Sequence, residues 1–278
     1  MAIDEKYQCD VDAILSHRYD GGADYWTTPD KRVLKGSPFS AYNSALMLLE
    51  LGMEPSEQVL KEVAELFFSL RKEDGRFKLY PGGSVYPCQT AHALNLLCNM
   101  GYQADERVQA TYRHLLETRH TDGGWRCNNT TYGRGPETEC SNPFPTLVAL
   151  NAFRFGGCLK DEPSLDRAVE FLLGHWTVRK PIGPCHYGIG TLFMQVEYPF
   201  YTYNLFYYVF VLSFYERARK DERFLEALAA LESKMADGQI VVERVVPKLA
   251  KFAFCKKGEP SELGTKRYRE ILANLGRD

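Results

Sequence analysis

The chain has 278 residues, of which 45% are hydrophobic and 25% are charged, a composition typical of folded globular proteins and unlike that of disordered ones. Its 34 Lys and Arg stand against 36 Asp and Glu, and a net charge of −2 argues against a nucleic-acid-binding protein. Neither a secretory signal nor an apolar run long enough to cross a bilayer is visible, so we expect a cytoplasmic protein without a transmembrane segment.

One pattern recurs along the chain: an Asp-Gly turn, a loop, an apolar helix that mostly ends in Gly, and an amphipathic helix. The Asp-Gly pairs begin at Asp20, Asp74, Asp122 and Asp237. The sequence predicts apolar helices over residues 37–52, 87–101, 142–157, 198–214 and 260–276. It predicts amphipathic helices over residues 10–18, 57–70, 106–119, 165–176 and 222–234.

The two classes of helix predict two layers. Helices that are apolar on all sides are buried, whereas the amphipathic ones keep one face in water. We therefore expect an all-α protein, a single domain over residues 1–278 that curves into an α/α toroid of about five hairpins. The hairpins lie near residues 5–52, 57–101, 105–157, 163–216 and 222–276. The best candidate for a short strand is Ile240 to Val246.

Two segments carry a resemblance to a known family. HLLETRHTDGGW, which ends at Trp125, and LFFSLRKEDGRF, which ends at Phe77, resemble the QW-type repeat of squalene and oxidosqualene cyclases. Together with PCQTAHALNLL and NPFPTLVALNAF, they resemble parts of the terpenoid cyclase and protein prenyltransferase superfamily of α/α toroids. The resemblance implies a central apolar cavity in which an isoprenoid-like substrate is bound or transformed.

The acid motifs of the cyclases, Asp-x-Asp-Asp and Asp-Cys-Thr-Ala-Glu, do not occur in this sequence. Two alternatives to a cyclase-like or prenyltransferase-like enzyme therefore stay open. One is a non-catalytic toroid that acts as a lipid-binding or protein-interaction module. The other is a zinc-dependent prenyltransferase-like subunit that needs a partner chain.

Several cysteines lie in loops or at the predicted starts of apolar helices, where a toroid would bring distant segments together. Four thiolates, or three together with one histidine, would satisfy a zinc ion or another thiophilic metal. The alternative is that they are unrelated buried thiols. The predicted donors are Cys88, Cys127, Cys140, Cys185 and His186.

Three residues are candidates for acid–base chemistry. His92 follows Cys88 by four residues on one helical face, so it is either a ligand or cavity acid/base, or a hydrogen-bonded core histidine. Glu137 and Glu139 precede Cys140 in a loop, and partial loss of water there would raise a carboxyl pKa and make a general acid. The alternative is a solvated loop. We expect His175, on an amphipathic helix, to lie at the surface.

The segment from Tyr198 to Tyr215 has ten aromatic residues among eighteen. Aromatic faces stabilise cations and accommodate an isoprenoid tail, and plain core packing is the competing explanation. The predicted substrate-binding residues are Tyr201, Tyr203, Tyr207 and Phe210, with the polar end of the ligand near Cys140. The basic residues near the C-terminus form either a diphosphate site or an exposed basic face: Lys256, Lys257, Lys266, Arg267 and Arg269.

Overall fold

A computed structural model describes residues 3–128 and 131–277 of the chain. Over these residues the regular elements are α-helices and short 3-10 helices, and β-pairing is limited to isolated bridges. The predicted all-α fold is therefore confirmed. No helix in the described ranges is both long and apolar enough to cross a membrane. The chain forms two compact units, Met1–Glu117 and Thr118–Asp278, while the single domain and the toroid stay predictions.

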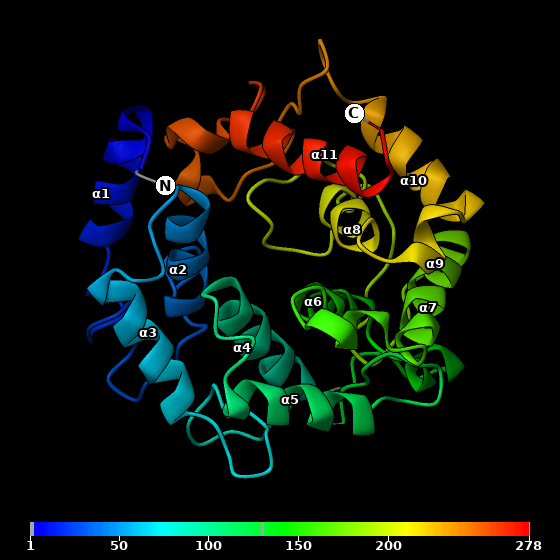
Figure 1. Ribbon diagram of the computed structural model, residues 1–278, viewed down its shortest axis with the longest axis horizontal. Helices are drawn as coiled ribbons and strands as arrows, with labels where there is room; N and C mark the ends of the chain where they lie inside the picture. The colour runs from blue at the N-terminus through cyan, green and yellow to red at the C-terminus, as the bar shows by residue number, and fades with distance from the viewer. Residues whose placement is uncertain (1–2, 129–130, 278) are drawn as a thin grey trace. The chain divides into compact units, whose positions relative to one another are not determined.

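The first unit consists of five α-helices preceded by one turn of 3-10 helix. These elements are η1 (Glu5–Tyr7), α1 (Gln8–Ser16), α2 (Ala41–Glu50), α3 (Gln58–Ser69), α4 (Pro87–Asn99) and α5 (Glu106–Glu117). The helix α2 packs against α4, while α3 contacts both and α5 contacts α4 (Figure 1). The predicted amphipathic stripe of α3 is the buried one, because Leu60, Val63 and Phe67 are fully enclosed.

The second unit contains the remaining six α-helices. These elements are η2 (Pro136–Glu139), α6 (Pro143–Phe153), η3 (Gly157–Asp161), α7 (Leu165–Val178), α8 (Leu205–Leu212), α9 (Glu216–Arg219), α10 (Glu222–Glu232), η4 (Pro247–Leu249), η5 (Ala253–Cys255) and α11 (Glu262–Asn274). Here α8 contacts α6, α10 and α11, and α7 packs against α6, α9 and α10 (Figure 1). Every residue of α8 is buried, as its apolar sequence predicts.

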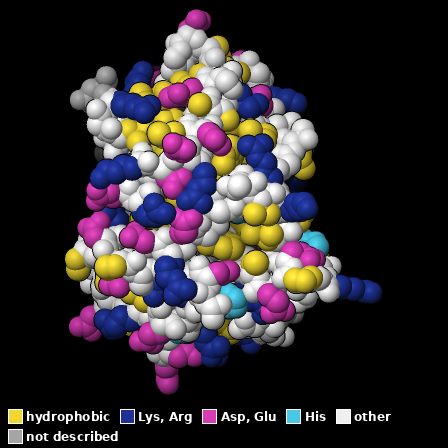
Figure 2. Space-filling model, turned by 90° about the vertical axis from the view of Figure 1, so that its right-hand side faces the viewer, with side chains coloured by type: hydrophobic (Ala, Val, Ile, Leu, Met, Phe, Trp, Pro, Cys, Tyr) yellow, Lys and Arg dark blue, Asp and Glu magenta, His cyan; other side chains and the backbone are white. Residues whose placement is uncertain are grey.

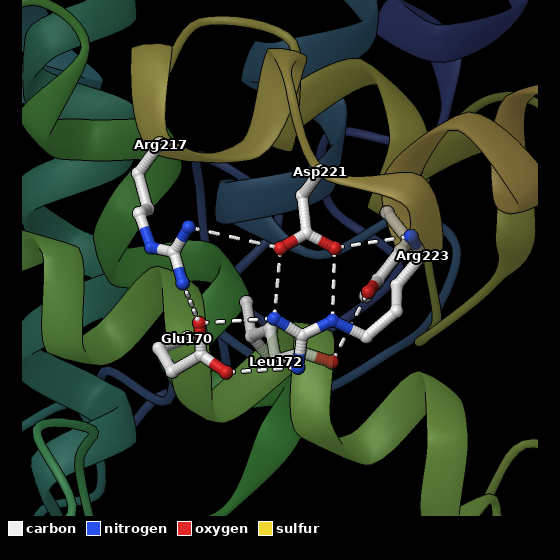
Figure 3. Close-up of polar contacts among 6 residues, drawn as sticks. Glu170, Leu172, Arg217, Asp221 and Arg223 are labelled. Atoms are coloured by element: carbon white, nitrogen blue, oxygen red, sulfur yellow. Dashed lines mark hydrogen bonds and ion pairs between the residues drawn. The ribbon is translucent and has the colours of Figure 1, made fainter.

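Charged residues join α7, α9 and α10 of the second unit. Arg223 of α10 donates to both carboxylate oxygens of Glu170 in α7, at 2.8 and 3.0 Å, and it also contacts Asp221. Figure 3 shows Arg217 of α9 turned toward the same Glu170. On the side where α7, α9 and α10 lie, acidic and basic side chains are interspersed (Figure 2). This side therefore has the mixed charge of an ordinary solvated surface.

The Asp-Gly turns at Asp74 and Asp122 repeat a single arrangement. Gly75 and Gly123 have positive φ angles of 89° and 94°, which glycine adopts without strain. Two residues after each of them, a buried aromatic residue donates its backbone N–H to a threonine hydroxyl of the following helix. The distance is 3.1 Å from Phe77 to Thr90 Oγ1 and 3.1 Å from Trp125 to Thr146 Oγ1. The turns are thus equivalent, as the repeat predicts.

Three local predictions were wrong. Residues 198–204 are a loop, since α8 begins only at Leu205, where Asn204 accepts a hydrogen bond from the Tyr207 N–H. Residues 240–246 form no strand, because their pairing consists of isolated bridges such as Val241 to Pro260. The helix α11 is not buried on all sides, because its sequence carries four basic or acidic residues after Gly264 and only part of one face is enclosed.

Candidate functional site

The predicted metal donors are divided between the units. Cys88 and His92 lie on α4 of the first unit, whereas the others occupy loops of the second: Cys127, Cys140, Cys185 and His186. Nowhere in residues 3–128 and 131–277 do three His, Cys, Asp or Glu side chains gather closely enough to hold a metal ion. The zinc centre therefore stays a prediction from the sequence.

His92 is fixed by its own helix. Its Nδ1 lies 2.7 Å from the carbonyl oxygen of Cys88, and because a carbonyl can only accept, Nδ1 carries the proton. The ring packs edge-on against Tyr42 at 5.1 Å. Loss of water contact lowers the pKa of His92, so the ring is neutral at neutral pH. This is the geometry of a hydrogen-bonded histidine in a helix, the second of the two predicted alternatives.

Glu137 meets His186, with 3.4 Å between Oε1 and Nε2. Backbone N–H groups, its own and that of Gly135, together with His186, hold the pKa of Glu137 below its ordinary value. The direction is opposite to the raised pKa that a general acid needs. Glu137 is therefore ionised and accepts hydrogen bonds, and its predicted role as a proton donor finds no support in this geometry.

Cys140 and Glu139 differ in their surroundings. Burial, followed by the charges of Asp122 and Glu139, raises the pKa of Cys140, so its sulfur keeps the proton at neutral pH. Glu139 is exposed and lies 3.8 Å from Arg126.

The neighbouring Cys185 is held through its backbone N–H, which donates to Asn142 Oδ1 at 2.9 Å. This loop is thus ordered by Asn142 and by the Glu137–His186 pair.

The loop before α8 is organised by a buried carboxylate that sequence analysis missed. Glu197 is only 1% exposed, and its Oε1 accepts from the Thr202 N–H at 2.8 Å and from the Thr202 hydroxyl at 2.9 Å. Arg244 faces the other oxygen at 3.3 Å. Glu197 is the only charged residue between positions 181 and 215, and this isolation in the sequence was the available sign of its role.

His175 is buried, and the prediction that it lies at the surface was wrong. Its Nε2 lies 3.0 Å from the carbonyl oxygen of Lys180 and therefore carries the proton, which leaves Nδ1 to accept from the Tyr203 hydroxyl at 2.9 Å. Burial lowers the pKa of His175 to about 4 and raises that of Tyr203. The predicted ligand-binding Tyr203 thus already uses its hydroxyl to join the loop before α8 to α7.

Three half-buried rings surround two of the predicted substrate-binding residues, and we call these five side chains the aromatic face. Phe200 stacks on Tyr207 at 4.9 Å and lies 5.4 Å from Phe210. Phe144 of α6 approaches Tyr207 edge-on at 6.5 Å, and Phe214 approaches Phe210 at 5.3 Å. Tyr207 and Phe210 are buried beneath the other three. Tyr201 is half-buried in the adjoining loop.

The aromatic face ends at a cation. Arg154 directly follows α6, and its guanidinium lies 4.6 Å from the Phe214 ring and 5.1 Å from the Phe210 ring. The sequence offered one sign of this residue, because Arg154 interrupts the apolar run NAFRFGG.

The chain matches no protein-family model, and no curated protein sequence is significantly similar to it. The superfamily suggested by the repeats accordingly stays a resemblance.

Proposed function

We propose that the protein binds an isoprenoid-like apolar molecule on the aromatic face of the second unit. The observation that carries the proposal is the position of Phe144, Phe200 and Phe214, which stay half-buried although they contact the buried Tyr207 and Phe210. Rings on three different segments thus present apolar surface together. Burial of a hydrocarbon against such surface contributes roughly 25 cal/mol per Å².

The proposal concerns binding. An ionised Glu137 and a protonated Cys140 thiol supply neither a general acid nor a thiolate nucleophile at neutral pH. The aromatic rings instead offer quadrupolar faces and dispersion contacts, both of which suit an unsaturated chain. A carrier or binding module therefore agrees with this geometry better than a cyclase does.

A chain-length series tests the proposal. The full chain is titrated with geraniol, farnesol and geranylgeraniol, and binding is followed by isothermal titration calorimetry. Affinity should rise with each prenyl unit, because every buried CH₂ contributes about 0.8 kcal/mol. Phe200→Leu and Phe144→Leu should each weaken geranylgeraniol binding roughly 5-fold, since each removes part of the stacking surface.

Tyr268→Leu is the matched control. Tyr268 is also a half-buried aromatic residue of the second unit, but it lies on α11 and donates its hydroxyl to Glu232 at 2.8 Å. This variant should bind geranylgeraniol like the wild type. An absence of binding for all three alcohols, or equal losses in the Phe200 and Tyr268 variants, would show that the rings serve packing alone.

A further inference from the structure

Arg154 differs from Arg223 and Arg244 of the second unit because no described residue forms a hydrogen bond or an ion pair with its guanidinium group. Its Nε is fully enclosed without a partner. Arg223 and Arg244, by contrast, face the carboxylates of Glu170 and Glu197. The carbonyl oxygen of Leu150 in α6 accepts from the backbone N–H of Arg154 and from the Tyr215 hydroxyl. Arg154 is therefore a cation whose side-chain donors are not used by the described part of the chain.

Aromatic rings hold the guanidinium in place. Its central carbon lies 4.2 Å from the Phe155 ring centroid, 4.6 Å from that of Phe214 and 5.1 Å from that of Phe210. Stacking of this kind occupies the two faces of the planar guanidinium group, whereas its N–H groups donate hydrogen bonds within the plane of the group. The rings thus orient Arg154 and leave its planar set of donors for an acceptor. A carboxylate or phosphate matches that set in a bidentate manner.

A second cation shares the same ring. Arg267 of α11 lies 5.7 Å from the Phe210 centroid and pairs with Glu270 at 2.6 Å. Loss of water contact, together with the charge of Arg267, lowers the pKa of Arg154 to about 10, so the group is still protonated at neutral pH. Glu270 supplies one carboxylate against these two guanidinium groups, which leaves an excess of positive charge. An anion at this point would relieve the repulsion.

We propose that Arg154, assisted by Arg267, binds an oxyanion, either a carboxylate or a phosphate, at the end of the aromatic face where α8 terminates. The oxyanion is the head group of a ligand whose apolar body lies on Phe210 and Phe214. The assignment of the body rests on the proposed function, whereas that of the anion does not. The sequence had placed the polar end of the ligand near Cys140, and the structure assigns it to Arg154.

Ligands with one tail and different head groups test the proposal. The full chain is titrated calorimetrically, at constant ionic strength, with decyl phosphate, decanoate and decanol. Arg154→Met keeps an apolar side chain of similar length and removes the donors, so it should weaken decyl phosphate binding at least 10-fold while decanol binding is unchanged. Arg267→Met, which removes only the assisting charge, should weaken it about 3-fold.

Arg179→Met is the matched control, because Arg179 also stacks on an aromatic ring, Trp176 at 4.6 Å, but donates to a backbone carbonyl and lies outside the aromatic face. It should bind decyl phosphate like the wild type. Arg154→Lys provides a second variant should the Met variant fail to fold, and it should bind the anion more weakly than the wild type because the planar donor set is lost.

The outcomes separate the two proposals. Binding of inorganic phosphate that depends on Arg154, without binding of decanol or geranylgeraniol, supports the oxyanion site and rejects the apolar-ligand function. Binding of the alcohols, with decyl phosphate and decanoate no tighter than decanol, rejects the oxyanion site alone. Equal affinity of the wild type and of Arg154→Met for decyl phosphate also overturns the proposed oxyanion site. A preference for decyl phosphate over decanoate, or the reverse, identifies the kind of oxyanion.

Discussion

The turn at Asp74 in the first unit and the turn at Asp122 in the second unit share one frame but use their aspartates differently. Asp74 accepts its hydrogen bonds from Arg76, its near neighbour in the chain. Asp122 reaches across nineteen residues and accepts from the Ser141 N–H at 2.7 Å. The two turns therefore share a structural arrangement, the glycine with positive φ and the bond from the aromatic residue to threonine. They differ because only the aspartate of the second turn binds the loop that leads into α6.

The largest effects should come from the buried aromatic residue that the two turns share. Trp125→Ala and Phe77→Ala should each lower the free energy of unfolding by about 4 kcal/mol, because each leaves a large cavity under a turn. Urea denaturation of the two variants measures this loss. Trp125→Phe, which keeps a ring, should cost about half as much. A loss below ~1 kcal/mol for either alanine variant would show that the two turns are not equivalent supports.

The aspartates should separate the turns. Asp122→Ala should cost about 2 kcal/mol, because charge-assisted bonds to the Ser141 backbone and hydroxyl are lost. Asp74→Ala should cost no more than about 0.5 kcal/mol, since its partner Arg76 lies at the surface. Chemical denaturation measures both, and Ser141→Ala combined with Asp122→Ala in a double-mutant cycle should show coupling between the two residues. Equal losses at positions 74 and 122 would remove the distinction.

The threonine acceptors should behave alike. Thr90→Val and Thr146→Val keep the shape of the side chain but leave the buried N–H of Phe77 or Trp125 without its acceptor, at a cost of about 1.5 kcal/mol each. Thermal unfolding of the two variants provides the comparison. Thr121→Val, at an exposed position next to the second turn, serves as the control and should change stability little. If the losses of stability at positions 90 and 146 differ more than twofold, the threonine hydrogen bond contributes to stability mainly in one of the two units.

The smallest effect should be a pH dependence that arises from Asp74 in the first turn. Arg76 holds the pKa of Asp74 at about 2, below the ordinary 3.8. Because the folded state favours the ionised form, this contribution is present above pH 4 and is lost as the pH falls toward 2. Solvent screening at this exposed site limits it to about 0.5 kcal/mol. Asp74→Asn should therefore flatten the acid limb of the stability curve slightly, and a steeper acid limb in this variant would contradict the assignment.

Helix type and position were predictable from the sequence because they follow from hydrophobic periodicity, proline and glycine. The ten predicted helices all exist, and the equivalence of Phe77 and Trp125 followed from their place after Asp-Gly. Two kinds of feature could not be predicted. The loop before α8 depends on Glu197, whose partners include the distant Arg244. The burial of His175 depends on Tyr203, which its helical pattern does not reveal.

The candidate site was only partly predictable for the same reason. Tyr207 and Phe210 could be identified as candidates from the sequence alone, because the local concentration of aromatic residues around them is visible without a structure. Arg154 and Arg267 are more than a hundred residues apart in the chain and share the Phe210 ring only after α6, α8 and α11 have packed. Contacts between residues so far apart in the chain leave no periodic pattern in the sequence. The interruption of the apolar run at Arg154 was the one local indication.

The hydrogen bond from each turn to its threonine also determines which segments of the chain can vary in length and sequence. The aromatic residue and the threonine are 13 residues apart in the first unit and 21 apart in the second, yet the hydrogen bond is 3.1 Å in both. A third example, Ile240 to Thr265, spans 25 residues at 3.0 Å. Each of these three bonds therefore fixes the two ends of a loop and leaves its length open. Insertions and new side chains can accumulate there without disturbing the helices, so these loops are the places where repeats of one ancestry can diverge in chemistry.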